Sequence, residues 1–327
     1  MLVAGEEPAR SCPLRDIEVA NTRITNRSKP GSGGSARNLV HLGGHVNRAG
    51  ALAIAYGVGE EALMEPRTLT YDVEGEGDPV VLVPGGLTGW VSWVPHAERL
   101  SARWRTIRVQ PIHNELGSAG HSGDPGYTAE TERESLRMTL DALEIETGHF
   151  AGWSAGGNAL IEFTLAYPER VRTLTLVEPA ADWVLAQLGE TDSDVERADA
   201  FMKKVSGKDV SEDDLAAFLE LAGFVSSKEE ARSHPNWDRW AAHRMALSWH
   251  TEDVERSGRS VEELANIRCP TLLIKGSVTT DWLKRVVDVL GERLPNATVL
   301  ELPGDHACHI QSIDAFLEAF EKRLRST

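Results

Sequence analysis

A serine flanked by glycines constrains this chain more than any other feature of its sequence. Residues 152–156 read Gly-Trp-Ser-Ala-Gly, after a short apolar run and before the helix-forming stretch 158–165. In such a turn from strand to helix, the serine adopts a strained backbone conformation and its hydroxyl stands clear of the sheet. Gly152 and Gly156 let the turn close without a Cβ clash. The pattern predicts that Ser154 is a nucleophile and that a helix N-terminus faces the charge developing beside it.

The composition indicates a globular, acidic protein. Of the 327 residues, 41% are hydrophobic, which is enough to bury a sizeable core. Fifty acidic residues against 34 basic ones give a formal charge of −16, which repels nucleic acid and anionic membranes. We therefore expect neither nucleic acid nor a membrane as a partner.

Cysteine usage and hydropathy indicate the compartment. The three cysteines, Cys12, Cys269 and Cys308, are too few and too scattered for a disulfide framework or a zinc site. No stretch approaches the ~20 apolar residues of a membrane-spanning helix, and the first residues contain no apolar run of signal length. No dinucleotide or Walker pattern follows a predicted strand. We expect a cytoplasmic protein with no metal and no cofactor.

Residues 1–63 differ in character from the rest of the chain. They contain the glycine- and serine-rich run 28–35, followed by a glycine-rich stretch with a weak helical pattern. Such runs are typical of flexible linkers. We expect residues 1–63 to be a flexible extension and a compact domain to begin at Met64.

From Met64 onward, predicted strands and helices alternate, which is typical of an α/β fold. This order favours a mostly parallel central sheet with helices on both faces. The predicted strands are residues 67–73, 79–83, 105–110, 149–153, 172–177, 271–275 and 298–302. The predicted helices of this part are residues 129–143, 281–292 and 313–324, and residues 111–126 are predicted to be a long loop.

The alternation stops between the fifth and sixth of these strands. Residues 181–265 show helical patterns with many charges, including 212–221 and 237–249, and no convincing strand. We expect this block to be a helical lid inserted into a core that residues 64–180 and 266–327 form.

The order of strand, glycine-rich turn, serine turn, helical insertion and late histidine resembles the α/β-hydrolase superfamily over residues 64–327. The resemblance implies that His306, which ends the run Pro303-Gly304-Asp305-His306 after the last strand, is the general base for Ser154. His309 lies three residues later, and we expect it to support the site or to begin a helix.

Acyl transfer also needs donors for the developing oxyanion, each worth roughly two to three orders of magnitude in rate. The resemblance implies that the backbone N–H groups of Ala155 and Gly86 supply them. Many members carry His-Gly in the turn that holds Gly86, and here Pro84 stands in place of the histidine. This departure removes a side chain and leaves the backbone donors.

The acid that orients His306 has two candidates. In the commonest arrangement it follows the strand after the lid, three residues past a glycine, and Thr279 occupies that position here. Asp281 lies two residues further on. Some families instead use the end of the strand before the lid, where this chain has Glu178. A carboxylate leaving a buried strand is costly unless it is paired, so we predict Glu178 and keep Asp281 as the alternative.

Three short motifs resemble the zearalenone-lactonase group. They are Val83-Pro84-Gly85-Gly86-Leu87, Glu178-Pro179 and Trp240-Ala241. That group opens a macrocyclic lactone, uses a glutamate at the Glu178 position and packs its substrate against a lid tryptophan. The resemblance therefore implies that Trp240 contacts the substrate.

Tryptophans of the expected lid favour a bulky apolar or aromatic substrate, because an indole offers a large contact area. The same side chains fit the core of the lid equally well. The residues predicted to contact the substrate are Leu87, Trp153, Trp183 and Trp240.

Together these features predict a cofactor-independent serine hydrolase that cleaves a carboxylic ester or lactone through an acyl-enzyme. Serine at the elbow excludes the haloalkane dehalogenases and epoxide hydrolases of this fold, which need an aspartate there. One alternative is hydrolysis of a carbon–carbon bond by the same triad. Another is a ligand receptor of the same fold that turns over slowly or not at all.

Overall fold

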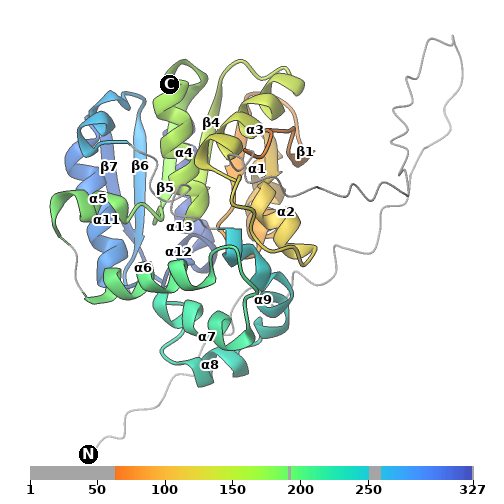
Figure 1. Ribbon diagram of the computed structural model, residues 1–327. Coiled ribbons are helices and arrows are strands. Elements are labelled where there is room, and N and C mark those ends of the chain that lie inside the picture. The colour runs from red at the N-terminus through yellow and green to blue at the C-terminus, as the bar shows by residue number, and fades with distance from the viewer. Residues whose placement is uncertain (1–62, 191–192, 250–258, 326–327) are drawn as a thin grey trace, which may run out of the picture. The chain divides into compact units, whose positions relative to one another are not determined.

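The computed structural model describes residues 63–190, 193–249 and 259–325, so nearly all of the predicted extension, residues 1–63, lies outside the described residues. At the centre is a seven-stranded sheet with the strand order β1-β3-β2-β4-β5-β6-β7 (Figure 1). β1 pairs antiparallel with β3, and every other neighbouring pair is parallel. The predicted mostly parallel sheet is therefore confirmed. The strands are β1 (Thr70–Glu74), β2 (Pro79–Val83), β3 (Arg105–Gln110), β4 (Gly148–Trp153), β5 (Val171–Val177), β6 (Thr271–Gly276) and β7 (Ala297–Leu302).

Helices cover both faces of the sheet, as predicted. One face carries α3 (Ala129–Ala142), α4 (Ala155–Ala166) and α11 (Asp281–Arg293), whose buried residues share one apolar cluster with the strands. α1 (Val94–Leu100) and α13 (Ile313–Leu324) lie together on the other face. Their contacts include the rings of His96 and Phe316, 5.1 Å apart, and an ion pair between Arg99 and Asp314.

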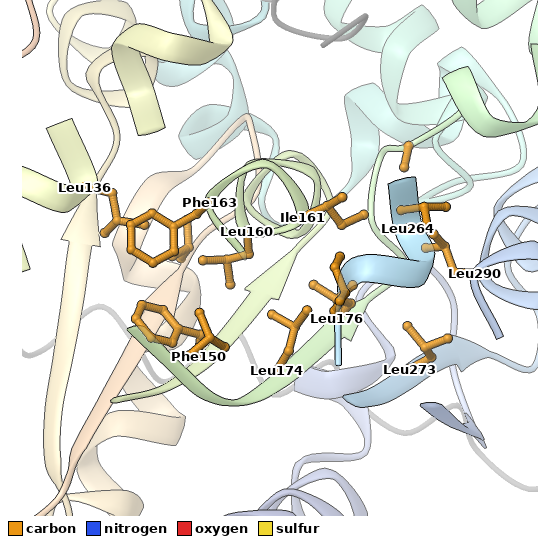
Figure 2. Close-up of a cluster of buried hydrophobic side chains, with 14 of the residues drawn as sticks. Leu136, Phe150, Leu160, Ile161, Phe163, Leu174, Leu176, Leu264, Leu273 and Leu290 are labelled. Atoms are coloured by element: carbon orange, nitrogen blue, oxygen red, sulfur yellow. The ribbon is translucent and has the colours of Figure 1, made fainter. Parts of the chain in front are cut away.

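The core between α4 and the sheet is apolar on both sides (Figure 2). Phe150 on β4 and Phe163 on α4 are fully buried with their rings 5.4 Å apart, and Leu174 and Leu176 on β5 complete the layer below Leu160. Burying each such side chain contributes about 1.5–3 kcal/mol. The continuous apolar runs of the sequence therefore become strands buried on both faces.

A long insertion separates β5 from β6, and its described residues are largely helical. Its elements are α5 (Trp183–Leu188), α6 (Ser193–Val205), α7 (Glu212–Leu221), α8 (Lys228–Ser233), α9 (Trp237–His243) and the 3₁₀ turns η4 (Arg244–Trp249) and η5 (Val261–Asn266). The described part of the insertion contains no strand. α6 to α9 form their own apolar cluster, which includes Leu215 and Leu219, and lie at the lower edge of the sheet in Figure 1.

Several local predictions were wrong because tertiary contacts decide the structure. Residues 111–126 contain α2 (Ile112–Ser118), which packs so closely on η4 that a Cβ at Gly117 would lie 2.3 Å from Ala246 Cα. Likewise, residues 237–249 form α9 and η4 rather than one helix. β1 begins at Thr70 rather than residue 67, because Arg67 N–H and Leu69 N–H donate to side-chain oxygens of α3 instead of to a strand.

A buried histidine predicts acid destabilisation. Burial lowers the pKa of His96 from 6.5 to about 4, and its Nε2–H donates to the His309 carbonyl at 3.0 Å. Below pH ~6.5 His96 is protonated in the unfolded chain but stays neutral in the folded chain. The free energy of unfolding therefore decreases as the pH is lowered, and His96 contributes about 3 kcal/mol to this decrease by pH ~4. We expect a shallower pH dependence for His96→Phe than for wild type in urea unfolding between pH 6.5 and 4. The exposed control His121→Phe keeps the wild-type dependence, and an unchanged slope in His96→Phe contradicts this account.

Candidate active site

Ser154 lies on the sharp turn between β4 and α4. Its backbone has φ 53° and ψ −121°, a conformation that costs a residue with a side chain about 1–3 kcal/mol. The turn is held in place by its N–H, which donates to Val177 O on β5 at 3.0 Å. A Cβ at Gly152 would lie 2.6 Å from Gly156 O, and one at Gly156 would lie 2.4 Å from Pro84 O. Both glycines are therefore required for the strand, the turn and the helix to approach one another.

Glu178 and His306 form a buried pair at the ends of β5 and β7. His306 is 3% exposed, and its Nδ1 lies 2.6 Å from Glu178 Oε2. Glu178 is fully buried, and its carboxylate also accepts hydrogen bonds from Gly276 N–H at 2.6 Å and from the Thr279 hydroxyl at 2.9 Å. A buried carboxylate needs such partners, because each unmet acceptor costs free energy. These bonds fix both the carboxylate and the direction of the imidazole ring.

Asp281, the alternative acid, lies elsewhere. It is exposed in the first turn of α11, and none of the contacts of the described residues joins it to His306. A carboxylate at this position stabilises a helix N-terminus. The fold thus brings Glu178 to His306 and leaves Asp281 at the surface.

Ser154 and His306 face the same cavity. Gly86, Ala155 and Ala180 join them in its wall, and the cavity encloses about 670 Å³ with its mouth counted. Because Nδ1 of His306 is bound to Glu178, Nε2 is the ring nitrogen that can hydrogen-bond to the Ser154 hydroxyl. No hydrogen bond joins Ser154 to His306 among the described residues, and such bonds often tighten only when substrate binds.

Apart from Asp182, the remaining cavity wall is apolar and comes largely from the insertion. α6 contributes Phe201 and Met202, α7 contributes Phe218 and Leu221, and α11 contributes Trp282. None of these residues was predicted from the sequence. A helical pattern, such as the one over residues 212–221, does not distinguish an apolar face that packs from one that lines a cavity.

The four predicted substrate contacts do not line this cavity. Leu87 and Trp240 pack within the apolar cluster of the insertion, where Trp240 stacks on His234 at 4.5 Å. Trp183 belongs to the main core, and its indole N–H donates to Asn158 Oδ1 at 3.1 Å. Trp153 lies beneath the loop that carries His306. Contact of these four residues with a substrate stays a prediction.

Trp153 instead connects the serine turn to the histidine loop. Its indole N–H donates to the His306 carbonyl at 2.8 Å, and its ring lies 5.5 Å from the His306 ring and 4.8 Å from that of His309. Burial, with the neighbouring imidazoles of His96 and His306, holds the pKa of His309 well below its usual range. His309 is therefore a neutral side chain that packs under the His306 loop. This position is consistent with the prediction that it supports the site.

Among residues 63–190, 193–249 and 259–325, no group of three or more His, Cys, Asp or Glu side chains is arranged to hold a metal ion. Within the same ranges, no helix has the length and apolar character to cross a membrane.

Comparison with known proteins decides the family. A family model described as the alpha/beta hydrolase fold matches residues 78–313. The chain belongs to the α/β-hydrolase family. It is 30% identical over 262 residues, 76% of this chain and 92% of the relative, to RutD of Azorhizobium caulinodans, which is named provisionally as a carbamate hydrolase.

Two more matches show how this α/β hydrolase relates to others. It is 32% identical over 108 residues to the carboxylesterase YbfK of Bacillus subtilis, which covers 32% of this chain and 35% of that protein. A structure of the meta-cleavage product hydrolase of Pseudomonas fluorescens IP01 superposes with a TM-score of 0.56 at 22% identity, over 78% of this chain and 93% of that one. The structural match shows a shared fold.

The Trp153 contact leads to a kinetic prediction. Trp153→Phe keeps an aromatic ring but removes the hydrogen bond to the His306 carbonyl. We expect kcat for an activated ester to fall roughly threefold to tenfold with KM nearly unchanged, because the bond positions the base rather than the substrate.

A matched variant separates this effect from a general loss of packing. Trp249→Phe also removes an indole hydrogen bond to a backbone carbonyl, the one to His121 O at 2.9 Å, and Trp249 does not line the cavity above Ser154. It should leave kcat within about twofold of wild type, because a mutation affects mainly the residues that it contacts, and His306 is not among them. Equal losses in the two variants would refute the positioning role.

Proposed function

We propose that this α/β hydrolase is a cofactor-independent serine hydrolase that cleaves a carboxylic ester or lactone. The observation that carries the proposal is the buried hydrogen bond between Glu178 Oε2 and His306 Nδ1, 2.6 Å long, together with the cavity that His306 and Ser154 both line. A carboxylate, an imidazole and a serine at a strained turn are the parts of an acyl-transfer triad.

In this mechanism His306 Nε2 removes the proton from Ser154 Oγ as Oγ attacks the substrate carbonyl carbon. The N–H groups of Gly86 and Ala155 stabilise the resulting oxyanion. The tetrahedral intermediate collapses, the C–O bond breaks, and the leaving oxygen takes the proton from His306. Water then attacks the acyl-enzyme with His306 as base, which releases the acid and restores Ser154. Glu178 stabilises the imidazolium at each step.

The cavity wall favours a fairly bulky apolar substrate. Phe201, Met202 and Phe218 reach over the reaction centre from the insertion, which acts as the lid of the site in this proposal. Aromatic and thioether groups give adaptable apolar contacts and exclude water. A macrocyclic lactone such as a zearalenone-like compound meets these requirements, and its leaving alcohol stays tethered to the acyl group.

The names of the relatives are consistent with attack on a carbonyl carbon. YbfK is named for ester hydrolysis and RutD for carbamate hydrolysis, and both reactions start with nucleophilic addition to C=O. The same triad serves the carbon–carbon alternative, for which the meta-cleavage hydrolase is named. Product analysis with an ester and a ketone-bearing substrate separates these reactions.

The assignment of the acid is tested with matched amide variants. Glu178→Gln should lower kcat for p-nitrophenyl butyrate and the rate of fluorophosphonate labelling at Ser154 by about a thousandfold or more, because the imidazole loses its orientation and its counter-charge. Asp281→Asn likewise replaces a carboxylate with an amide, but at an exposed position. Its kcat and labelling rate should stay within about twofold of wild type.

Intact-mass analysis reads the labelling, and circular dichroism checks that each variant is folded. Loss of label in Ser154→Ala locates the modified residue. A larger loss in Asp281→Asn than in Glu178→Gln would reverse the assignment of the acid. A folded wild-type protein that takes no label and hydrolyses no ester would favour the ligand-receptor alternative.

The lid wall makes a separate prediction about substrate size. Phe218→Ala should raise KM for a naphthyl ester by about tenfold and leave p-nitrophenyl acetate almost unaffected, since a small acyl group does not reach α7. Leu219→Ala is the matched control, because Leu219 is fully buried on the same helix and does not line the cavity. If both variants change KM alike, the lid wall does not bind the substrate.

A further inference from the structure

A second cavity runs along α4, and the proposed mechanism does not use it. Its near end is lined by Ala155 and Ala180, which also line the cavity above Ser154. From there Asn158, Ala159 and Glu162 line it at the spacing of one helix face. At 1.5 Å per residue, Glu162 lies on the order of 10 Å along α4 from Ala155. The cavity encloses about 730 Å³ with its opening counted.

The side walls of this cavity are apolar. Leu69, Val83, Val109 and Leu136 line it, and each is at least 93% buried by the rest of the protein, with exposures of 3%, 3%, 0% and 4%. Such walls favour an extended hydrocarbon chain over a polar or hydrated group.

The far end carries a buried acceptor with an unmet hydrogen bond. Glu162 is 2% exposed, and its Oε2 accepts from Arg259 Nε at 3.4 Å. Its other oxygen, Oε1, has no hydrogen-bond partner among the described residues. Leaving a buried charged acceptor unsatisfied is costly, so a ligand that donates a hydrogen bond there gains the corresponding stabilisation.

Three other polar residues of the cavity wall, His113, Tyr127 and Glu132, hydrogen-bond to one another. Tyr127 O–H donates to Glu132 Oε1 at 2.5 Å, and His113 N–H donates to the same oxygen at 3.3 Å. Burial, together with the adjacent Glu132, raises the pKa of Tyr127 well above its usual range, so the phenol keeps the proton that it donates. Glu162 Oε1 is a buried acceptor of the cavity wall that none of these bonds uses.

We propose that this cavity is a subsite for an apolar arm of the substrate that ends in a neutral hydroxyl group, which donates to Glu162 Oε1. The inference rests on the proposed acyl transfer at Ser154 and specifies its substrate. A carboxylate end is repelled by Glu162. An ammonium end gains less than a hydroxyl end, because Arg259 already pairs with Glu162, the guanidinium of Arg133 lines the same cavity, and burying a further cation costs several kcal/mol.

The test compares substrates that differ only at the end of the arm. Two ester series are used: p-nitrophenyl esters of octanoate, ω-hydroxyoctanoate and ω-aminooctanoate, and acetates of octanol and ω-hydroxyoctanol. We expect kcat/KM to be on the order of tenfold higher for the hydroxyl-ended chain than for its methyl-ended counterpart in at least one series. No preference in either series, or a preference for the amino end, overturns the proposal.

Variants locate the effect. Glu162→Met removes the acceptor at similar volume and should abolish the hydroxyl preference. Glu263→Met is the matched control, because Glu263 is the other carboxylate paired with Arg259 and does not line the cavity. If Glu162→Met does not fold, Ala159→Leu serves instead. It narrows the cavity midway, so it should depress turnover of both octanoyl esters at least tenfold more than that of p-nitrophenyl acetate.

Two measurements distinguish a failed subsite from failed chemistry. p-Nitrophenyl acetate is too short to reach Glu162, so its hydrolysis reports on Ser154 alone. Calorimetric titration of Ser154→Ala with ω-hydroxyoctanol and with octanol reports on the subsite without catalysis, and the diol should bind on the order of tenfold more tightly. Equal affinities overturn the subsite, whereas a wild type inert toward acetate overturns the acyl-transfer mechanism.

Discussion

The site depends on a carboxylate that cannot remain buried without partners. Glu178 directly follows β5, an inner strand of the sheet, where it is fully buried, and it bonds to the backbone of β6, to the Thr279 hydroxyl and to His306. Each of these bonds offsets the cost of removing the charge from water. The same bonds join the ends of three strands, so satisfying Glu178 also positions the imidazole. The same hydrogen bonds therefore hold the strand ends together and arrange the site.

Backbone strain is concentrated at the same edge. Ser154 and Glu178 both have positive φ, 53° and 39°, at the carboxyl ends of the neighbouring strands β4 and β5. Such conformations persist only where the surroundings fix them, here through the bond from Ser154 N–H to Val177 O and through the close approach of glycines. Trp153 adds a bond from the serine turn to the His306 carbonyl. The rigid sheet thus holds the reactive groups, while the insertion supplies the apolar wall.

Features set by local patterns were predictable from the sequence. β2 and β3 have the predicted bounds, and β2 is the continuous apolar run that is typical of a buried parallel strand. The elbow, the late histidine and the glutamate after β5 could be recognised from order along the chain. α2 was missed because its close packing on η4, and not its local sequence, favours the helix. The role of Trp153 as a tether and the cavity wall from α6 and α7 depend on side-chain directions that spacing does not reveal.

The most direct test of this account is the low-field proton NMR spectrum of the protein at neutral pH. A proton held between His306 Nδ1 and the Glu178 carboxylate, 2.6 Å apart and shielded from solvent, should give a strongly deshielded and slowly exchanging signal. We predict that His306→Ala removes this signal, that Glu178→Gln shifts it upfield or removes it, and that Asp281→Asn leaves it unchanged. A wild-type spectrum without the signal, or one that only Asp281→Asn alters, would contradict the account.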